Sequence, residues 1–243
     1  AFLLLGAVSA LVAIIFIKAI FFTEDIANKI PIPSWTRPPI GGLAIGLIAI
    51  FCPYILGAGY GTTDAALKNA IPIDLLCLLI IAKIAATSIS LAFRYGTGIF
   101  SPSLLLGAVI GSTFGYVATL AFPELASDYG LYAIVGMGAV SSAVLGAPIS
   151  TILIIFELTG DYQITLMLMI AVVTANLITT HHLKATSFFH LQLKRKGQDM
   201  EGSRAKYLSQ QFKVKKIMSH DFSTVGTETS LERVKELIVK LHY

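Results

Sequence analysis

Long apolar segments alternate with short polar connections along most of the chain. Five of these segments are predicted to be helices, namely residues 1–22, 40–56, 73–93, 103–122 and 162–180. Crossing the hydrocarbon core of a bilayer takes about 20 apolar residues, because each helical residue advances the chain by about 1.5 Å. Each segment approaches that length and holds at most two charged side chains. The pattern predicts an all-α integral membrane protein that crosses the bilayer several times.

A sixth apolar stretch, residues 130–156, is interrupted by Gly-Ala-Pro at 146–148. Pro148 has no amide hydrogen and suits the first turn of a helix, so this stretch is predicted to form two shorter helices. Residues 31–34 and 57–61 are rich in Pro and Gly and are predicted to be turns. Irregular backbone at membrane depth must be surrounded by protein or water.

Gly107, Gly111 and Gly115 recur at every fourth position of the 103–122 segment. This spacing puts three residues without side chains on one face of a helix, where a neighbouring backbone can approach closely. We expect these glycines to serve helix packing.

Charge divides the chain into two regions. Overall, 55% of the residues are hydrophobic and 13% are charged, against roughly 25% charged in an average soluble domain. Residues 1–183 hold six basic and eight acidic residues, whereas residues 184–243 hold twelve basic and six acidic ones. The positive-inside rule therefore predicts a cytoplasmic C-terminal end. An anionic-lipid patch is the alternative interpretation of the same basic cluster.

The C-terminal segment from about residue 212 has the composition of a soluble domain. Residues 214–218 are predicted to form a short strand or turn, and residues 229–242 a helix capped by Thr229 or Ser230. About 30 residues cannot close a core alone, so we expect only the start of a domain. The chain also begins at Ala1 within an apolar run, which suggests a fragment.

Residues with reactive side chains are few. Cys52 and Cys77 lack metal-ligand spacing, and both are predicted to be small core residues. His181 and His182 are interpreted as residues of the membrane interface. Because the sequence has no nucleophile–base pair, phosphate-binding loop or metal cluster, we expect no enzyme activity, no metal and no bound cofactor. A nucleic-acid partner is not expected either.

Residues 94–103 form a glycine-rich turn that enters a charge-free helix. The first amide groups of a helix have no intrahelical acceptor, and the helix dipole adds about half a positive charge there. Such a site holds an anion less tightly than a full Lys or Arg charge would, which permits release. The pattern thus suggests an anion site, with a simple hinge at a helix entry as the alternative.

Residues 98–107 read Gly-Ile-Phe-Ser-Pro-Ser-Leu-Leu-Leu-Gly and resemble the GxFxP signature and following helix of the CLC family of chloride channels and chloride/proton antiporters. Segments 57–62, 136–139 and 147–162 agree with the family in the same order. The resemblance implies the second of two inverted repeats with broken and re-entrant helices. It also implies a homodimer in the lipid bilayer that moves chloride and, in antiporters, protons.

The resemblance implies domains at 1–197 (membrane domain, C-terminal half), 198–211 (cytosolic linker) and 212–243 (start of an α/β cystathionine-beta-synthase, or CBS, domain). A complete CBS pair can bind adenine nucleotides, but no residue here is assigned to one. For the anion, the resemblance implies contacts from the backbone at the signature residues Gly98, Ile99, Phe100, Ser101 and Pro102, with the amides of Ile99 and Phe100 central.

One residue departs from the family pattern. Phe189 stands where the family usually places a pore tyrosine, so the hydroxyl donor is absent and proton coupling is expected to be less strict. His190 is not expected to compensate, because adjacent helical residues point about 100° apart. Arg94 is a candidate vestibule charge that raises the local anion concentration, whereas Lys83 and Glu157 are interpreted as structural.

The expected function is therefore transmembrane transport of chloride or a similar small anion, by a channel or a chloride/proton antiporter. The alternative is a membrane anchor that does not transport and whose CBS tail senses nucleotide. The acidic residues that gate the pore and carry protons in the family belong to segments outside this sequence.

Overall fold

The computed structural model describes residues 1–124, 127–197 and 226–240. Within these ranges every regular element is a helix. The chain divides into two compact units, Ala1–Gln198 and Asp199–Tyr243. The first unit contains the helices α1 (Phe2–Lys29), α2 (Arg37–Phe51), η1 (Pro53–Ile55), α3 (Tyr60–Leu67), α4 (Ile73–Ala92), α5 (Phe100–Ala121), α6 (Tyr129–Leu145), α7 (Pro148–Thr159), α8 (Tyr162–Leu183) and α9 (Phe188–Arg195).

The apolar segments are helical, as predicted, but several of their ends differ from the predicted ones, most clearly at the ends of α1 and α2. Helix α1 continues to Lys29, seven residues beyond the predicted end. The segment predicted as 40–56 ends at Phe51 and continues as the short 3₁₀ helix η1. Proline disfavours the helical conformation in the residue before it, and Cys52, which precedes Pro53, takes φ −139° and ψ 77°. The eight-residue helix α3 was not predicted, because its apolar pattern is too short to recognise.

The division of residues 130–156 into two helices is confirmed. Helix α6 ends at Gly146, which has the left-handed φ of 68°, and Pro148 begins helix α7. A Cβ on Gly146 would lie 2.0 Å from the Thr186 carbonyl oxygen, so this corner also has no room for a side chain. The positive φ and the close approach both favour glycine here.

The predicted packing role of the glycine face on α5 is also confirmed. Added Cβ atoms on Gly107 and Gly111 would lie 2.4 Å from the Gly136 carbonyl oxygen and 2.1 Å from the Tyr132 carbonyl oxygen, respectively. Gly115 lies against the Tyr132 side chain. Backbone therefore meets backbone between α5 and α6, and this interface holds the start of α5 in place.

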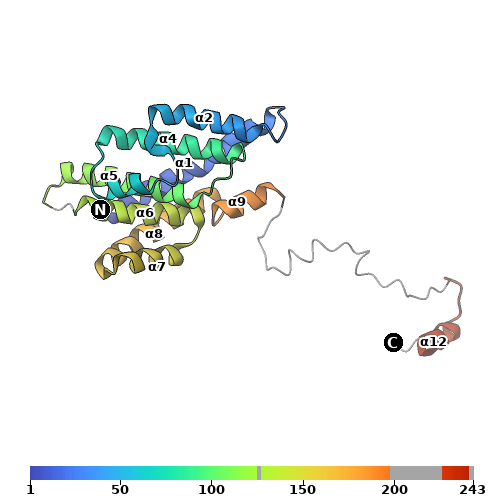
Figure 1. Cartoon of the computed structure of the whole chain (residues 1–243). Coiled ribbons are helices and arrows are strands. Elements are labelled where there is room, and N and C mark those ends of the chain that lie inside the picture. The colour runs from blue at the N-terminus through green and yellow to red at the C-terminus, as the bar shows by residue number, and fades with distance from the viewer. Residues whose placement is uncertain (125–126, 198–225, 241–243) are drawn as a thin grey trace. The chain divides into compact units, whose positions relative to one another are not determined.

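The core lies between α1, α4, α5, α6 and α8. Figure 1 shows these helices stacked side by side, with α2 at one edge of the bundle and α7 at the other. Phe16 and Tyr132 are completely or almost completely buried, and the Tyr132 ring stacks on Phe2 at a centroid distance of 5.4 Å. Asn176 of α8 donates to the buried hydroxyl of Ser142 on α6 at 2.7 Å, which links two helices inside the apolar interior.

The outer faces of the bundle carry large exposed apolar side chains, among them Leu43 and Leu47 on α2, Leu153 on α7, and Ile170 and Leu177 on α8. Among the described residues, four helical segments have the length and composition to cross a membrane: Phe2–Lys29, Ile73–Ala92, Phe100–Ala121 and Tyr162–Arg195, which joins α8 to α9. Apolar outer faces of this kind suit contact with lipid or with another apolar surface.

The cysteine prediction holds for one residue of the two. Cys52 is buried, with 2% of its surface exposed. Cys77 is exposed and lies on the face of α4 that is turned away from the core, so the prediction of a core position for it was wrong. In an apolar helix, composition does not distinguish the face that packs inward from the face that points outward.

The second unit contains one described helix, α12 (Leu231–Lys240), which falls within the helix predicted at 229–242. The predicted strand or turn at 214–218 and the predicted linker at 198–211 lie outside the described residues. The CBS domain and its boundary remain predictions.

Candidate anion site at the start of helix α5

Helix α4 ends in a cap that redirects the chain toward α5. The N–H of Tyr95 donates to the Ser90 carbonyl at 2.9 Å, and the N–H of Arg94 donates to the Leu91 carbonyl at 3.2 Å. This pair of bonds defines a Schellman motif, whose left-handed position is usually glycine. Arg94 occupies that position with φ 57°. Its backbone makes the turn while its side chain is exposed.

The turn continues through Gly96, whose φ of 82° again requires a residue without a side chain. Ile99 is the N-cap of α5 and its side chain is 4% exposed, packed in the core. Buried packing of this side chain anchors the turn, so the backbone of α5 starts at a defined place. The first helical bond runs from the N–H of Ser103 to the Ile99 carbonyl at 3.2 Å.

The N–H groups of residues 96–101 have no hydrogen-bond acceptor in the described part of the chain. Pro102 follows them and has no N–H to offer. Helix α5 has 22 residues and no acidic side chain in its first turn. The positive end of its dipole therefore stays uncompensated by a carboxylate, and the free amides form the arrangement that binds anions at helix N-termini.

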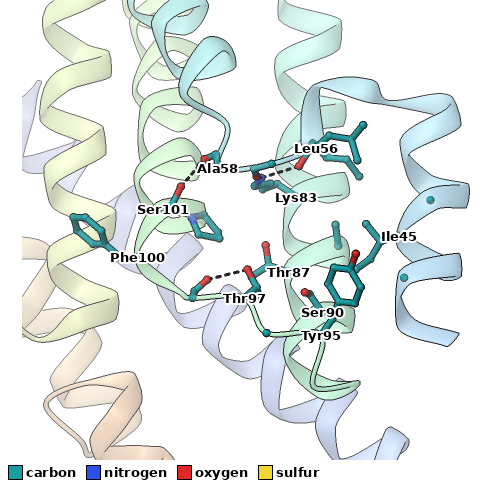
Figure 2. A pocket seen from close by; sticks show the side chains of 18 residues that line it. Ile45, Leu56, Ala58, Lys83, Thr87, Ser90, Tyr95, Thr97, Phe100 and Ser101 are labelled. Atoms are coloured by element: carbon teal, nitrogen blue, oxygen red, sulfur yellow. Dashed lines mark hydrogen bonds between the residues drawn. The ribbon is translucent and has the colours of Figure 1, made fainter. Parts of the chain in front are cut away.

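Five of the six residues that carry these amides, all except Ile99, line a cavity of about 730 Å³, shown in Figure 2. Its walls come from α2, from α4, from the loop at 55–58 and from residues 95–98 and 100–102. Figure 2 shows Lys83, Thr87 and Ser90 of α4 facing the loop that carries Ala58 and the α5 start that carries Ser101. Lys83 is the one charged side chain in the part of this wall that the structure describes.

The segment opposite α5 runs from η1 to Ala58, and its carbonyl groups accept hydrogen bonds from three helices. The bonds run from Thr62 to Tyr54 at 3.0 Å, from Lys83 to Ile55 at 2.8 Å and to Gly57 at 3.2 Å, and from Ser101 to Ala58. The last of these ties the loop directly to the first turn of α5. Buried backbone carbonyls need such donors when no helix or sheet supplies them.

The predicted site residues lie in three different places. Gly98, Phe100, Ser101 and Pro102 line the cavity, whereas Ile99 is buried and is not part of the described cavity wall. Arg94 lies at the end of α4 but is absent from the described cavity wall, and so is Phe189. The anion-contact roles of all these residues stay predictions.

Phe189 lies near the start of α9 with 49% of its surface exposed. Ser187 caps this helix by accepting from the N–H of His190 at 3.1 Å. Phe188, not Phe189, is buried, and its ring stacks on Phe21 of α1 at 5.3 Å. The His190 ring pairs through Nδ1 with the Thr186 hydroxyl at 3.2 Å, so one of its two nitrogens already has a local partner.

Sequence reasoning interpreted Lys83 as structural, and its hydrogen bonds to two backbone carbonyls agree with that, but the reasoning did not foresee that its partner is the segment at 55–58. The available signal was a lysine in the middle of an apolar helix, since such residues mark functional sites in membrane proteins. His181 and His182 lie at the end of α8, and no cluster in the described residues has the ligands for a metal.

Comparisons with known proteins agree with the signature at 98–102. Residues 1–180 match the family model described as "Voltage gated chloride channel". The chain is 32% identical over 181 residues to the H(+)/Cl(-) exchange transporter ClcA of Yersinia pestis, covering 73% of this chain and 38% of that protein. It is 34% identical over 168 residues to the putative chloride channel protein ClcB-like of Ralstonia nicotianae, covering 69% of this chain and 39% of that protein.

A third relative, the H(+)/Cl(-) exchange transporter ClcA of Cronobacter sakazakii, is 32% identical over 182 residues, or 73% of this chain and 39% of that protein. The chain therefore spans somewhat less than two fifths of the length of these curated relatives. The family match covers most of the bundle and includes the turn, the cavity wall and the glycine face. This chain belongs to the voltage-gated chloride channel family.

Proposed function

We propose that this chain is part of a membrane protein that transports chloride or a similar small anion, as a channel or as a chloride/proton exchanger. The observation that carries the proposal is the row of unpaired amides at residues 96–101, at the positive end of α5, where all of these residues except Ile99 line the cavity. Partial charges on amides bind an anion weakly enough to release it, which transport requires. The names of the similar proteins support the same substrate.

We further propose that the bundle is the second of two inverted repeats and that the complete protein is a homodimer. The exposed apolar faces of α2, α7 and α8 support additional contacts with lipid or protein. The basic residues Lys184, Lys194, Arg195 and Lys196 support a cytoplasmic position for the end of α9. A CBS domain after it, with an adenine nucleotide on a complete pair, belongs to the same proposal.

Phe189 bears on the choice between a channel and an exchanger. A phenyl ring narrows a pore but donates no hydrogen bond. If Phe189 occupies the tyrosine position of the family, chloride is held less firmly and proton movement is coupled less tightly. Arg94 would act at a distance from the amides, by attracting anions toward the entrance.

The experiment is chloride efflux from liposomes containing the complete protein, recorded together with external pH. We expect chloride efflux in the wild type, and Phe189→Tyr should add a donor that increases the number of protons moved per chloride. Proton uptake driven uphill by the chloride gradient identifies an exchanger, whereas chloride efflux without proton movement in both proteins identifies a channel. Absence of any anion flux would contradict transport and favour the anchor alternative.

A further inference from the structure

We propose that Lys83 is a positioning residue for the anion site, because its ammonium group holds the loop at 55–58 against the first turn of α5. This inference rests on the proposed function, since it concerns the same anion site. It differs from a direct role, in which the lysine charge itself would attract the anion.

Lys83 is 4% exposed and lies in the middle of the apolar helix α4. A buried ammonium is costly unless it is paired or fully hydrogen-bonded. No carboxylate within the described residues forms an ion pair with it. Instead Nζ donates to the carbonyl of Ile55 at 2.8 Å and to that of Gly57 at 3.2 Å. Two carbonyl dipoles thus take the place of a counter-ion.

The loop depends on these bonds because residues 56–59, between η1 and α3, have no regular structure. Gly57 and Gly59 in this segment have left-handed φ values of 66° and 82°. Among the side chains around it, Thr62 supplies a further donor, to Tyr54. Charge-assisted hydrogen bonds are roughly twice as strong as neutral ones, so the lysine is the strongest restraint on the loop.

The loop is linked in turn to the anion site. Ser101, the second residue of α5, donates to the carbonyl of Ala58, which follows the residues held by Lys83. Figure 2 shows both sets of bonds on the same wall of the cavity. The chain of contacts therefore runs from the ammonium of Lys83 through the loop to the first turn of α5.

The arrangement has an electrostatic consequence for an anion. Carbonyl oxygens carry partial negative charge and repel chloride, so a free loop beside the amides would weaken binding. Here the oxygens of Ile55 and Gly57 face an ammonium, and that of Ala58 faces a hydroxyl. Lys83 thus keeps two of these oxygens engaged, and the amides at the start of α5 stay unpaired beside them.

The experiment compares Lys83→Met, Lys83→Gln and Lys83→Arg in the complete protein. Two readouts are measured: the chloride dissociation constant of the purified protein by calorimetry, and the melting temperature without chloride. Because Met leaves two carbonyls without donors, we expect it to weaken chloride binding about tenfold. Gln keeps a donor without the charge and should weaken binding about two- to threefold, and Arg should restore it almost completely.

Lys68→Met serves as the matched control. Lys68 is an exposed lysine just after α3 whose ion pair with Asp64 at 2.8 Å is open to solvent, so its loss should change chloride affinity by less than twofold. A lower melting temperature for Lys83→Met with unchanged chloride affinity would mean that the lysine only stabilises the fold. Equal weakening by Gln and Met, with Arg fully active, would assign a direct role to the charge. Either result overturns the inference.

A double-mutant cycle tests the link to α5. If Lys83 and Ser101 restrain the same loop, the effects of Lys83→Met and Ser101→Ala on chloride affinity should be non-additive, with the double variant no more than about twofold weaker than Lys83→Met. Additive effects would contradict the proposed connection. Absence of chloride binding in the wild type would instead overturn the proposed function, so the two failures are distinguishable.

Discussion

At the scale of single residues, the site depends on backbone groups more than on side chains. Ile99 turns its side chain into the core and leaves its amide at the start of α5. Phe100 begins the helix, and its N–H has no acceptor in the described part of the chain. The identities of these residues matter for placing the backbone, whereas the proposed binding groups are amides, which every residue except proline carries.

Removal of the amide hydrogen at Phe100 should therefore weaken the site without changing any side chain. We predict that an amide-to-ester replacement at this position reduces chloride affinity about tenfold, or about 1.4 kcal/mol. Calorimetry of the purified protein measures the change. An ester at Leu104 is the control, because its amide lies inside α5. That replacement should lower stability while leaving affinity near the wild-type value, and equal affinities in both esters would exclude the amide of Phe100 as a ligand.

Arg94 allows a separate prediction, because a left-handed conformation is strained for a residue with a side chain. Its φ of 57° occupies the glycine position of the α4 cap. Arg94→Gly should stabilise the protein by about 1 kcal/mol, seen as a higher melting temperature. If Arg94 also acts as a vestibule charge, Gly should reduce chloride flux at low ionic strength while Arg94→Lys preserves it. Loss of stability in the glycine variant would contradict the strain argument.

At the scale of elements, two contacts define where α5 begins and how it is held. The glycine face of α5 lies against α6 backbone to backbone. The cap of α4 and the turn through Gly96 then set the direction in which α5 starts. In a separate contact, Arg195 Nη1 of α9 lies 3.0 Å from Asp25 Oδ1 of α1, and the Arg195 guanidinium carbon lies 4.4 Å from the centre of the Phe21 ring. That exposed ion pair adds little stability by itself.

The α5–α6 contact should tolerate no side chain at its centre. We predict that Gly111→Ala destabilises the protein by about 3 kcal/mol or prevents folding, because the new Cβ would lie 2.1 Å from a carbonyl oxygen. Gly46→Ala on α2 is the matched change, since nothing lies within 4 Å of its Cβ. It should stabilise the helix by about 0.5–1 kcal/mol. Thermal unfolding in detergent compares the two, and similar melting temperatures would contradict the close approach.

At the scale of the whole molecule, the distribution of charge and apolar surface determines how the bundle sits in a membrane. Four helical segments of the described chain can cross a bilayer, and the connections after α8 and α9 carry basic side chains. The apolar faces of α2, α7 and α8 point outward. The bundle therefore needs lipid or a further apolar surface around it, as expected for a segment that spans less than two fifths of its relatives.

The orientation can be tested with a single cysteine. After Cys52 and Cys77 are replaced by serine, the Lys196→Cys variant should be labelled by a membrane-impermeant maleimide only when the cells are permeabilised. Exposure of position 196 makes it accessible to the reagent. The Asp161→Cys variant is the control. Its cysteine lies on the connection between α7 and α8, so it shows whether the reagent labels the opposite end of α8. Labelling of the Lys196→Cys variant in intact cells would place the end of α9 outside.

The sequence by itself determined the long apolar helices, the break before Pro148, the glycine face of α5 and the family signature at 98–102. These features are local, because they follow from the length of apolar runs, from glycine spacing and from the geometry of proline. The tertiary structure alone decided which cysteine is buried, that α3 exists as a helix, and that Lys83 meets the loop at 55–58. Lys83 and Ile55 are 28 residues apart. Contacts over such separations depend on how the helices pack against one another, which no local pattern specifies.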